Sequence, residues 1–335
     1  MRVCFFAPVS ERRILERVEF YKQDLDILRG LGFDVTIATR WSEIPWNADL
    51  YFVWWWTWAF LPLVKARLQR RPVLITGTFD YRWPVPGHDY YSRPAWQRWL
   101  LQFALKHASA NIFVSELEYF SVSRELGANN SFYVPHVLDT QLYAEGSGAR
   151  EDIVLTVATL HKPNAERKCM AEVIRTIPCV RTRHPSARFI IAGERGSAYP
   201  ELQGLAAKLG VADVLSFPGI ISKERKIQLM QQCKVYLQPS VYEGFGMAIL
   251  EAMSCGAAVV SSPVGAVPET LGDAGLLVEG RSPEALGVAV NQLLSDDVLR
   301  RDLGRRARRR VETHFSFEHR KRALERIIND VLAKQ

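Results

Sequence analysis

Short apolar runs of strand length alternate with segments of helical periodicity along almost the whole chain. Between residues 18 and 28 apolar side chains recur at helical spacing, and Gly30 or Gly32 is expected to end that helix. The runs that read as strands in the first half are Val3 to Phe6, Val35 to Ala38, Leu50 to Trp54, Val73 to Thr78, Ala110 to Val114 and Phe132 to Val134. Such alternation favours parallel sheets built from strand–helix–strand units, and therefore an α/β fold.

The best candidate for a linker is the polar stretch at residues 145–152, Glu-Gly-Ser-Gly-Ala-Arg-Glu-Asp. A second alternating series begins directly after it, with the run Ile-Val-Leu-Thr-Val-Ala at residues 153–158. At 335 residues the chain is long enough for two domains that each bury a core. We therefore expect one domain over residues 1–147 and a second over residues 148–316.

The chain carries 43 Lys and Arg against 36 Asp and Glu, a net charge of +7 that suits an anionic ligand or a membrane surface. Much of the excess lies in arginine-rich runs at residues 300–310 and 320–322. Such runs are typical of solvated helix faces, and contact with anionic lipid head groups is the alternative. No recognition motif for nucleic acid accompanies the charge, so we expect no nucleic-acid partner.

Cysteine usage and the apolar runs bear on the compartment. The five cysteines are scattered and form no Cys-x-x-Cys pair, which favours a reduced cytoplasm over a disulfide framework or a zinc site. The opening run Met-Arg-Val-Cys-Phe-Phe-Ala is too short for a signal core, and the longest apolar stretch, Leu50 to Val64, has 15 residues, too few to span a bilayer comfortably. We expect a cytoplasmic protein, with peripheral contact at the inner membrane face as an open alternative.

Two carboxylates, Glu243 and Glu251, stand eight positions apart, with the turn Gly244-Phe-Gly246 directly after the first. The glycines let backbone N–H groups come close to a ligand. A helix is expected to start at about Met247, so the positive end of its dipole faces the turn. Acceptors for hydroxyl groups beside donors for anionic oxygens are what a sugar attached to a phosphate requires.

This segment resembles the donor-binding Glu-x7-Glu motif of retaining glycosyltransferase family 4, and the resemblance extends over roughly residues 150 to 320. Ala248 and Ala258 stand where the family usually has proline, and neither change removes a polar group. Members have the GT-B fold. The resemblance therefore implies two Rossmann-like, doubly wound domains that face each other across a cleft, with a last helix at residues 317–335 that crosses back to the first domain.

The same resemblance implies an enzyme. It would be a retaining glycosyltransferase that moves a sugar from a GDP- or UDP-linked donor to a saccharide or lipid-linked acceptor hydroxyl, in cell-surface polysaccharide or glycolipid biosynthesis. The donor base and sugar, the acceptor, the linkage and the oligomeric state stay open. The alternatives are another GT-B activity, such as a phosphorylase or an epimerase, and a catalytically silent sugar-nucleotide-binding subunit. We expect no cofactor and no metal, because Asp24-Leu-Asp26 lies inside a predicted helix that would separate its two carboxylates.

The family pattern also implies roles for single residues. Glu243 resembles the residue that contacts the donor sugar, and Glu251 the residue that binds the ribose. Arg167 and Lys168 resemble the basic pair that binds the donor diphosphate, and they stand near an expected helix start, where the dipole disfavours cations. The residues expected to present backbone groups to the donor are Gly244, Phe245, Gly246, Met247, Gly219 and Ile220. Ala158-Thr159 replaces the usual Gly-Arg, which puts one phosphate contact in doubt.

The first domain departs from the family pattern. The loop after its first strand, residues 8–13, contains no glycine, and Phe79 stands where members often place a histidine that contacts the sugar. The weaker site candidates of this domain are Ser10, Arg12, Arg13, Asp80 and His136, the last expected at the edge of the cleft.

All nine tryptophans lie between Trp41 and Trp99, and three are consecutive, Trp54 to Trp56. Core packing is the default interpretation. A strand with one buried face cannot turn three consecutive side chains inward, so some indoles are expected at the cleft or the surface. Because indole rings stack on sugars and settle at membrane interfaces, an acceptor or lipid-linked role is a reasonable alternative.

Overall fold

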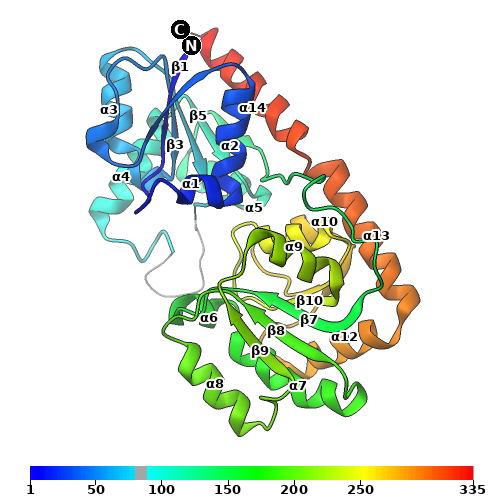
Figure 1. The fold of residues 1–335 in the computed structure, drawn as a ribbon. Helices are drawn as coiled ribbons and strands as arrows, with labels where there is room; N and C mark the ends of the chain where they lie inside the picture. Colours follow the sequence, from blue (N-terminus) through cyan, green and yellow to red (C-terminus); the bar gives the residue numbers. More distant parts are fainter. Residues whose placement is uncertain (80–88, 335) are drawn as a thin grey trace. The chain divides into compact units, whose positions relative to one another are not determined.

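The computed structural model describes residues 1–79 and 89–334, which divide into two compact units (Figure 1). Unit 1 comprises Met1–Val137 and Phe315–Gln335, and unit 2 comprises Leu138–His314. Each unit contains a parallel six-stranded sheet with helices packed against it. The expected α/β class is confirmed.

The sheet of unit 1 has the strand order β2-β1-β3-β4-β5-β6. All six strands predicted in the first half are present, within two residues at each end, and α2 ends at Gly30 as expected. The strands are β1 (Arg2–Phe6), β2 (Asp34–Ala38), β3 (Leu50–Trp54), β4 (Val73–Gly77), β5 (Ala110–Phe113) and β6 (Ser131–Tyr133). The helices are α1 (Ile14–Arg17), α2 (Glu19–Gly30), α3 (Phe60–Leu68), α4 (Ala95–His107), α5 (Glu116–Leu126) and α14 (Phe317–Leu332).

The tryptophan run follows a strand that is buried on both faces. Side chains alternate along β3, so Trp54 enters the core beneath α2 and α14, while Tyr51 and Val53 enter the core beneath α3 and α4. Trp56, in the turn after the strand, fills this second core, and Trp55 is half-buried against the first core. The expectation of a strand with one buried face was wrong, because both faces of this sheet carry helices.

The sheet of unit 2 has the strand order β12-β11-β10-β7-β8-β9. Its strands are β7 (Glu151–Val157), β8 (Arg188–Ala192), β9 (Leu215–Gly219), β10 (Cys233–Gln238), β11 (Ala258–Ser261) and β12 (Gly275–Leu277). Its helices are α6 (Lys162–Arg167), α7 (Met170–Arg183), α8 (Tyr199–Lys208), α9 (Lys223–Gln232), α10 (Met247–Ser254), α11 (Val267–Leu271), α12 (Pro283–Ser295) and α13 (Asp297–His314). The large core on one face of this sheet is formed with α7, α8 and α12.

The chain passes between the units after Val137 and after His314. The first of these crossings precedes the linker predicted at residues 145–152, because residues 138–144 are hydrogen-bonded to unit 2. Gln231 Nε2 donates to the Ala144 carbonyl at 2.8 Å, and Arg308 Nη1 donates to the Tyr143 carbonyl at 2.7 Å. At the other end, α14 packs into the core of unit 1 with Leu324, Ile327 and Ile328.

Several arginines of the carboxy-terminal runs are part of the packed structure. Arg300 and Arg320 are buried, while Arg308 and Arg310 donate to backbone carbonyls of Ser254 and Thr270 at 2.8 and 2.9 Å. The interpretation of these runs as solvated helix faces was wrong for these four residues. Arg308 and Arg310 thereby cap carbonyl groups that the carboxy-terminal ends of α10 and α11 leave without intrahelical donors.

The order of strands identifies where each sheet can bind a ligand. In unit 2 the chain runs outward from β7 through β8 to β9, and then from β10 in the opposite direction to β12. In open α/β sheets, ligands bind outside the carboxyl ends of the strands at such a switch point. The switch points are therefore between β7 and β10 in unit 2, and between β1 and β3 in unit 1.

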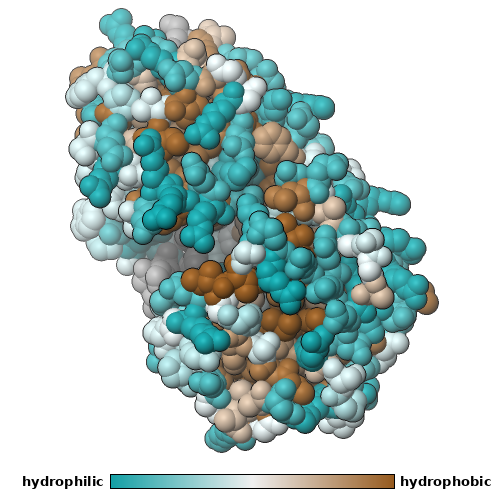
Figure 2. Space-filling model, in the orientation of Figure 1, coloured by the Kyte–Doolittle hydropathy of each residue, from teal (hydrophilic) through white to brown (hydrophobic). Residues whose placement is uncertain are grey.

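Figure 2 shows a face of the molecule that is mostly hydrophilic, with separate hydrophobic patches. Among the helices within residues 1–79 and 89–334, none is long and apolar enough to cross a membrane.

Candidate active site

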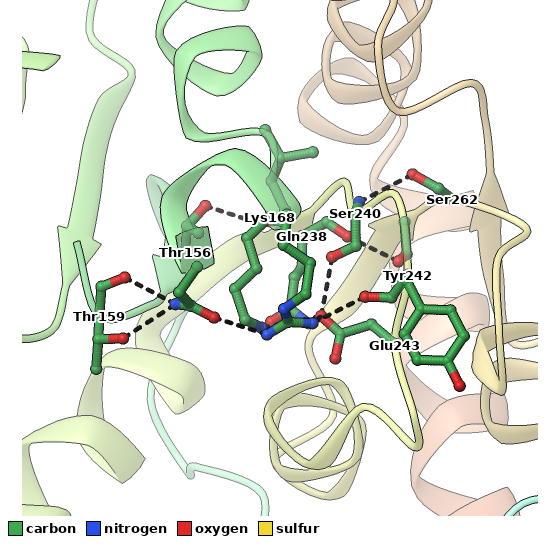
Figure 3. A network of polar contacts seen from close by, with 12 residues as sticks. Thr156, Thr159, Lys168, Gln238, Ser240, Tyr242, Glu243 and Ser262 are labelled. Carbon is green, nitrogen blue, oxygen red and sulfur yellow. Dashed lines mark hydrogen bonds and ion pairs between the residues drawn. The ribbon is translucent and has the colours of Figure 1, made fainter. Parts of the chain in front are cut away.

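Polar side chains surround Glu243 at the switch point of unit 2 (Figure 3). Four side chains converge on one carboxylate oxygen, Oε1. Lys168 Nζ and Gln238 Nε2 donate to it at 3.0 Å and Ser240 Oγ at 2.9 Å, while Arg167 Nη1 forms an ion pair with it at 3.0 Å and donates to the Tyr242 carbonyl at 2.8 Å. The other oxygen, Oε2, accepts no hydrogen bond from the part of the chain that the structure describes, and Figure 3 shows it pointing away from the network. The carboxylate is thus fixed through one oxygen and presents the other.

The basic pair is positioned by a short helix. Arg167 is the last residue of α6, and Lys168 follows it as the carboxy-terminal cap. The Val241 N–H donates to the Arg167 carbonyl at 2.8 Å, which joins this corner to the loop after β10. The pair lies between two helix ends. The dipole of the short α6 favours cations there, and α7 begins two residues after Lys168, so the expected helix start is also present.

The loop that carries Glu243 is held by the loop after β11. The Glu243 carbonyl accepts the Ala266 N–H at 2.9 Å, and Ser240 donates its N–H to Ser262 Oγ at 3.1 Å. A Cβ at Gly265 would stand 2.1 Å from the Glu243 carbonyl oxygen, so only glycine fits this close approach. These contacts fix the backbone that aims the carboxylate.

Charge interactions keep Glu243 ionised. Burial raises the pKa of this carboxyl, but the charges of Lys168 and Arg167 outweigh burial and bring the pKa to about 2. Burial lowers the pKa of Lys168, and the Glu243 carboxylate offsets part of that effect. Two cations around one carboxylate leave an excess of positive charge at the mouth of the site, which favours an anionic ligand.

Glu251 lies on α10, and its carboxylate is also held through a single oxygen. Its Oε1 accepts from Lys226 Nζ at 2.6 Å and from the Tyr143 hydroxyl at 3.1 Å. Tyr236 lies close to both glutamates, and burial together with the two carboxylates raises its pKa well above 10. Its hydroxyl therefore stays protonated and donates to Gln238 Oε1 at 2.7 Å.

The turn between the two glutamates presents the amino-terminal end of α10. Gly246 precedes the helix with φ +93°, and α10 begins at Met247, as expected. The Phe245 carbonyl accepts from Thr270 Oγ1 at 2.9 Å, so the turn from Gly244 onward is anchored. The first turn of a helix leaves N–H groups without intrahelical acceptors, which makes this end suited to anionic oxygens.

Residues 144–310 match the family glycosyl transferases group 1. The chain belongs to this family. A relative in Acidothermus cellulolyticus, D-inositol 3-phosphate glycosyltransferase, is 32% identical over 193 residues, which cover 52% of this chain and 42% of the relative. The chain spans about half or less of the length of curated relatives that it matches. The family resemblance predicted from the sequence is confirmed.

Solved structures identify the fold of this glycosyltransferase family member. Sucrose-phosphate synthase from Thermosynechococcus elongatus superposes with a TM-score of 0.81 at 19% identity, covering 100% of both chains. The Anabaena protein HepE, solved in complex with UDP and glucose, superposes with a TM-score of 0.80 at 17% identity, covering 98% of this chain and 100% of HepE. The two doubly wound units together form a GT-B fold, as predicted.

The remaining residues expected to bind the sugar donor, Gly219 and Ile220, also lie at the carboxyl edge of the sheet of unit 2. Gly219 ends β9 with φ +80°, and its carbonyl accepts the Gly193 N–H at 3.0 Å. Ile220, the next residue, is exposed. The described contacts do not join these two residues to the network around Glu243.

The candidates of unit 1 do not form one cluster. Ser10 and Arg13 are exposed after β1, and Arg12 donates to the Ile37 carbonyl at 2.8 Å. Asp80 lies outside the described residues. The expectation of His136 at a cleft edge was wrong, because its ring is buried in the core, where it stacks on Trp54 at 5.8 Å.

Phe79, at the position where family members often have histidine, is buried, and its N–H donates to Glu118 Oε2 at 2.7 Å.

Near the switch point of unit 1 lies a pocket of about 260 Å³. It is lined by Pro8, Trp55, Trp56, Thr57, Trp58, Thr78, Phe79, Arg93 and Leu101. The aromatic residues of the run Trp54 to Trp58 thus divide between the two cores and this pocket.

The two carboxylates of Asp24-Leu-Asp26, which the sequence did not favour as a metal motif, form ion pairs with cations of the chain itself. Asp24 pairs with Arg320, and Asp26 pairs with Lys22. Within residues 1–79 and 89–334, no group of three or more His, Cys, Asp or Glu side chains could hold a metal ion.

Sequence reasoning missed four side chains that hold the two glutamates. Gln238 and Ser240 stand at the carboxyl end of β10, where the rule for parallel sheets could have indicated them. Lys226 and Tyr143 come from α9 and from the segment before β7, and local sequence pattern carries no signal for either.

Proposed function

We propose that this protein is a retaining glycosyltransferase that passes a sugar from a GDP- or UDP-linked donor to an acceptor hydroxyl. The observation that carries the proposal is the carboxylate of Glu243. Three hydrogen bonds and the ion pair with Arg167 hold its Oε1 beside the start of α10, and Oε2 is left for a ligand. A hydroxyl-rich ring bound to a diphosphate fits this pairing of an acceptor with cations and N–H groups.

In the proposed reaction the acceptor oxygen forms a bond to the anomeric carbon while the bond from that carbon to the diphosphate oxygen breaks. The electron pair and the growing negative charge go to the diphosphate, which takes the acceptor proton on the same face. Arg167, Lys168 and the first N–H groups of α10 would stabilise that charge, and in many enzymes such fixed cations and dipoles supply most of the rate enhancement. The Glu243 carboxylate would stabilise the ring as it becomes cation-like.

The second glutamate is proposed to bind the ribose. Glu251 offers a carboxylate oxygen that Lys226 and Tyr143 do not use, and an ionised carboxylate only accepts hydrogen bonds. Vicinal hydroxyls of a ribose are matching donors. HepE, which has the same fold, was solved in complex with UDP and glucose, and this supports a nucleoside diphosphate as the ligand proposed here.

The acceptor is proposed to approach unit 1 at the aromatic pocket near its switch point. Half-buried Trp55 and exposed Trp58 present ring faces on which a pyranose can stack, and Arg93 adds a cation. This lining favours a saccharide or lipid-linked acceptor over a purely apolar one. Biosynthesis of a surface polysaccharide or glycolipid is the role proposed for such a reaction.

Titration calorimetry with UDP and with GDP tests donor binding, and incubation with a panel of nucleotide sugars tests the reaction. Slow hydrolysis of one donor with retained anomeric configuration supports transfer. Nucleoside diphosphate binding without turnover of any donor and acceptor pair would instead indicate a silent subunit. Inversion of the free donor at C2 would indicate an epimerase.

The reaction is proposed to need no metal ion, since Arg167 and Lys168 stand where a metal would otherwise neutralise the diphosphate. Turnover is expected to survive EDTA at its full rate. Loss of turnover on chelation, with recovery on addition of Mg²⁺ or Mn²⁺, would overturn this part of the proposal.

A further inference from the structure

The outer side of α3 and α4 in unit 1 carries an exposed group of aromatic side chains. We call it the aromatic face and define it by the exposed Trp58, Trp96 and Trp99 and the half-buried Phe60 and Phe103, with Trp58 in the turn before α3. Trp96 and Trp99 are 62% and 57% exposed and stand three residues apart on one side of α4. The ring of Phe60 lies 6.0 Å from that of Trp99 and 5.3 Å from that of Phe103, which joins the two helices.

The exposed tryptophans of this face are additional to the core, whereas Phe103 also packs against it. The opposite sides of the same helices already bury Leu63 and Ala66 from α3, and Leu101, Ala104 and Leu105 from α4. Figure 1 shows α3 and α4 next to each other along one side of unit 1. Tryptophan ranks near the middle of the Kyte–Doolittle scale, so this side is pale in Figure 2 although it exposes large rings. Solvent-exposed aromatic clusters of this kind mark surfaces that bind something.

The two segments that form the aromatic face carry charge of a single sign. Residues 50–79 and 90–115 contain no Asp and no Glu, whereas the whole chain has 36. The same ranges carry seven basic residues, namely Lys65, Arg67, Arg70, Arg71, Arg93, Arg98 and Lys106. Arg67 and Lys106 are exposed near the carboxy-terminal ends of α3 and α4, next to Phe103 and His107. An anionic surface meets no repulsion in these segments.

The arginine-rich helix α13 has a different charge pattern. Arg301 and Arg305 pair with acidic residues of the same helix, Asp297 and Asp302. Arg306 pairs with Asp273, and Arg308 donates to backbone carbonyls. The helix also lacks exposed aromatic residues along its length. Most arginines of α13 therefore form ion pairs or hydrogen bonds within unit 2.

We propose that the aromatic face docks on the surface of an anionic lipid bilayer. Indole rings prefer the boundary between head groups and acyl chains, where the ring is buried and the N–H stays hydrated. Basic residues beside them meet lipid phosphates, and each contributes on the order of 1 kcal/mol near an anionic leaflet. Aromatic anchors on one side of a helix pair with an acid-free basic border are the features of a surface that lies on a membrane without crossing it.

Vesicle flotation tests the proposal with the full chain. The intact protein is expected to float with vesicles of phosphatidylcholine mixed with phosphatidylglycerol, and to bind phosphatidylcholine alone at least about tenfold more weakly. Trp96→Ala/Trp99→Ala should lower the partition coefficient on the mixed vesicles on the order of tenfold or more. Arg67→Glu/Lys106→Glu, which keeps the aromatic residues, should lower it on mixed vesicles but hardly on neutral ones.

Two control variants change similar groups outside the face. Phe120→Ala removes an exposed ring on α5, and Arg305→Glu reverses an exposed charge on α13, and both should float like the intact protein. Thermal unfolding of every variant identifies any that fail to fold, and the charge-reversal pair then carries the test alone. UDP and GDP affinity should be unchanged throughout, because the proposal does not depend on the donor site.

Three results would overturn the proposal. The first is an intact protein that does not float with mixed vesicles. The second is a Trp96→Ala/Trp99→Ala variant that floats as well as the intact protein. The third is a tryptophan variant whose size-exclusion elution changes from oligomer to monomer, which would assign the aromatic face to contact between copies of the chain.

Discussion

Each unit contains a buried ion pair at its centre, and the two pairs differ in how completely their atoms are used. In unit 1, Arg320 Nε and Nη2 donate to the two oxygens of Asp24 at 2.6 and 3.0 Å. Arg320 Nη1 donates to the Val134 carbonyl at 2.7 Å, and neither side chain of the pair is exposed. In unit 2, by contrast, all the donors around Glu243 reach a single oxygen.

The difference separates a cross-link from a binding group. A carboxylate whose two oxygens are both satisfied inside the protein has nothing left to offer a ligand. A carboxylate held through one oxygen is oriented, remains charged and can accept from outside. The same residue types therefore serve stability in unit 1 and, as we propose, the donor in unit 2.

The largest expected effect is on the stability of unit 1. Arg320→Ala leaves the Asp24 carboxylate buried without its partner and should lower the free energy of unfolding by about 3–5 kcal/mol. Chemical denaturation measures the change, and UDP or GDP affinity of the folded variant should not move. The double variant Asp24→Leu/Arg320→Met, which replaces the pair with apolar groups, should recover much of the loss. A loss below about 1 kcal/mol in Arg320→Ala would contradict the cross-link.

Lys168→Ala should show the opposite pattern. Turnover should fall roughly 30- to 1000-fold, or about 2–4 kcal/mol, because a charge-assisted contact to the leaving diphosphate is lost. Lys168 is buried, so its removal also bears on stability. We still expect a small change in unfolding free energy, because Glu243 keeps Arg167, Gln238 and Ser240. Turnover equal to that of the intact protein would remove Lys168 from the site.

The two glutamates sharpen the comparison within unit 2. Glu251→Gln should weaken binding of the bare nucleoside diphosphate by about 1–2 kcal/mol, the usual worth of a hydrogen bond to a charged group. Glu243→Gln should leave that binding nearly unchanged and lower turnover instead, since its charge matters most in the transition state. Calorimetry of both variants beside a turnover assay decides the matter. Equal losses of diphosphate affinity would show that the assigned roles do not hold.

The smallest expected effect is on the pH dependence of unit 1. Burial, together with the charge of Arg320, lowers the pKa of His136 well below 6.5. Below pH 6.5 the imidazole of His136 takes up a proton in the unfolded chain but not in the folded chain. The free energy of unfolding should therefore fall by about 1 kcal/mol between pH 6.5 and about pH 5.5. In unit 2, Glu243 with its pKa of about 2 keeps its contribution down to about pH 4.5, and loses it as the pH falls further toward 2.

Denaturation curves at a series of pH values measure this dependence. His136→Gln, which retains a polar group beside Gln23, should flatten the curve below pH 6.5. An unchanged slope in this variant would assign the titration to another group.

Local pattern predicted the six strands of unit 1, the strand β7 of unit 2, the end of α2 at Gly30 and the start of α10 at Met247, because these depend on neighbouring residues. It placed Arg167 and Lys168 next to a helix start, which is that of α7, but it missed α6, which is too short to show a period. The pairing of Asp24 with Arg320 joins residues 296 positions apart, and the contacts of Tyr143 and Lys226 with Glu251 are also long-range. Such pairs are set by how elements pack, which a single sequence does not display.

The return of α14 to unit 1 has a consequence for synthesis on the ribosome. Unit 1 begins the chain, yet its core includes Leu324, Ile327 and Ile328, which are translated after the whole of unit 2. Asp24 and the apolar side chains beneath α14 therefore wait for their partners until about 180 further residues of unit 2 have been made. The unit that is translated second can be the first to complete its fold.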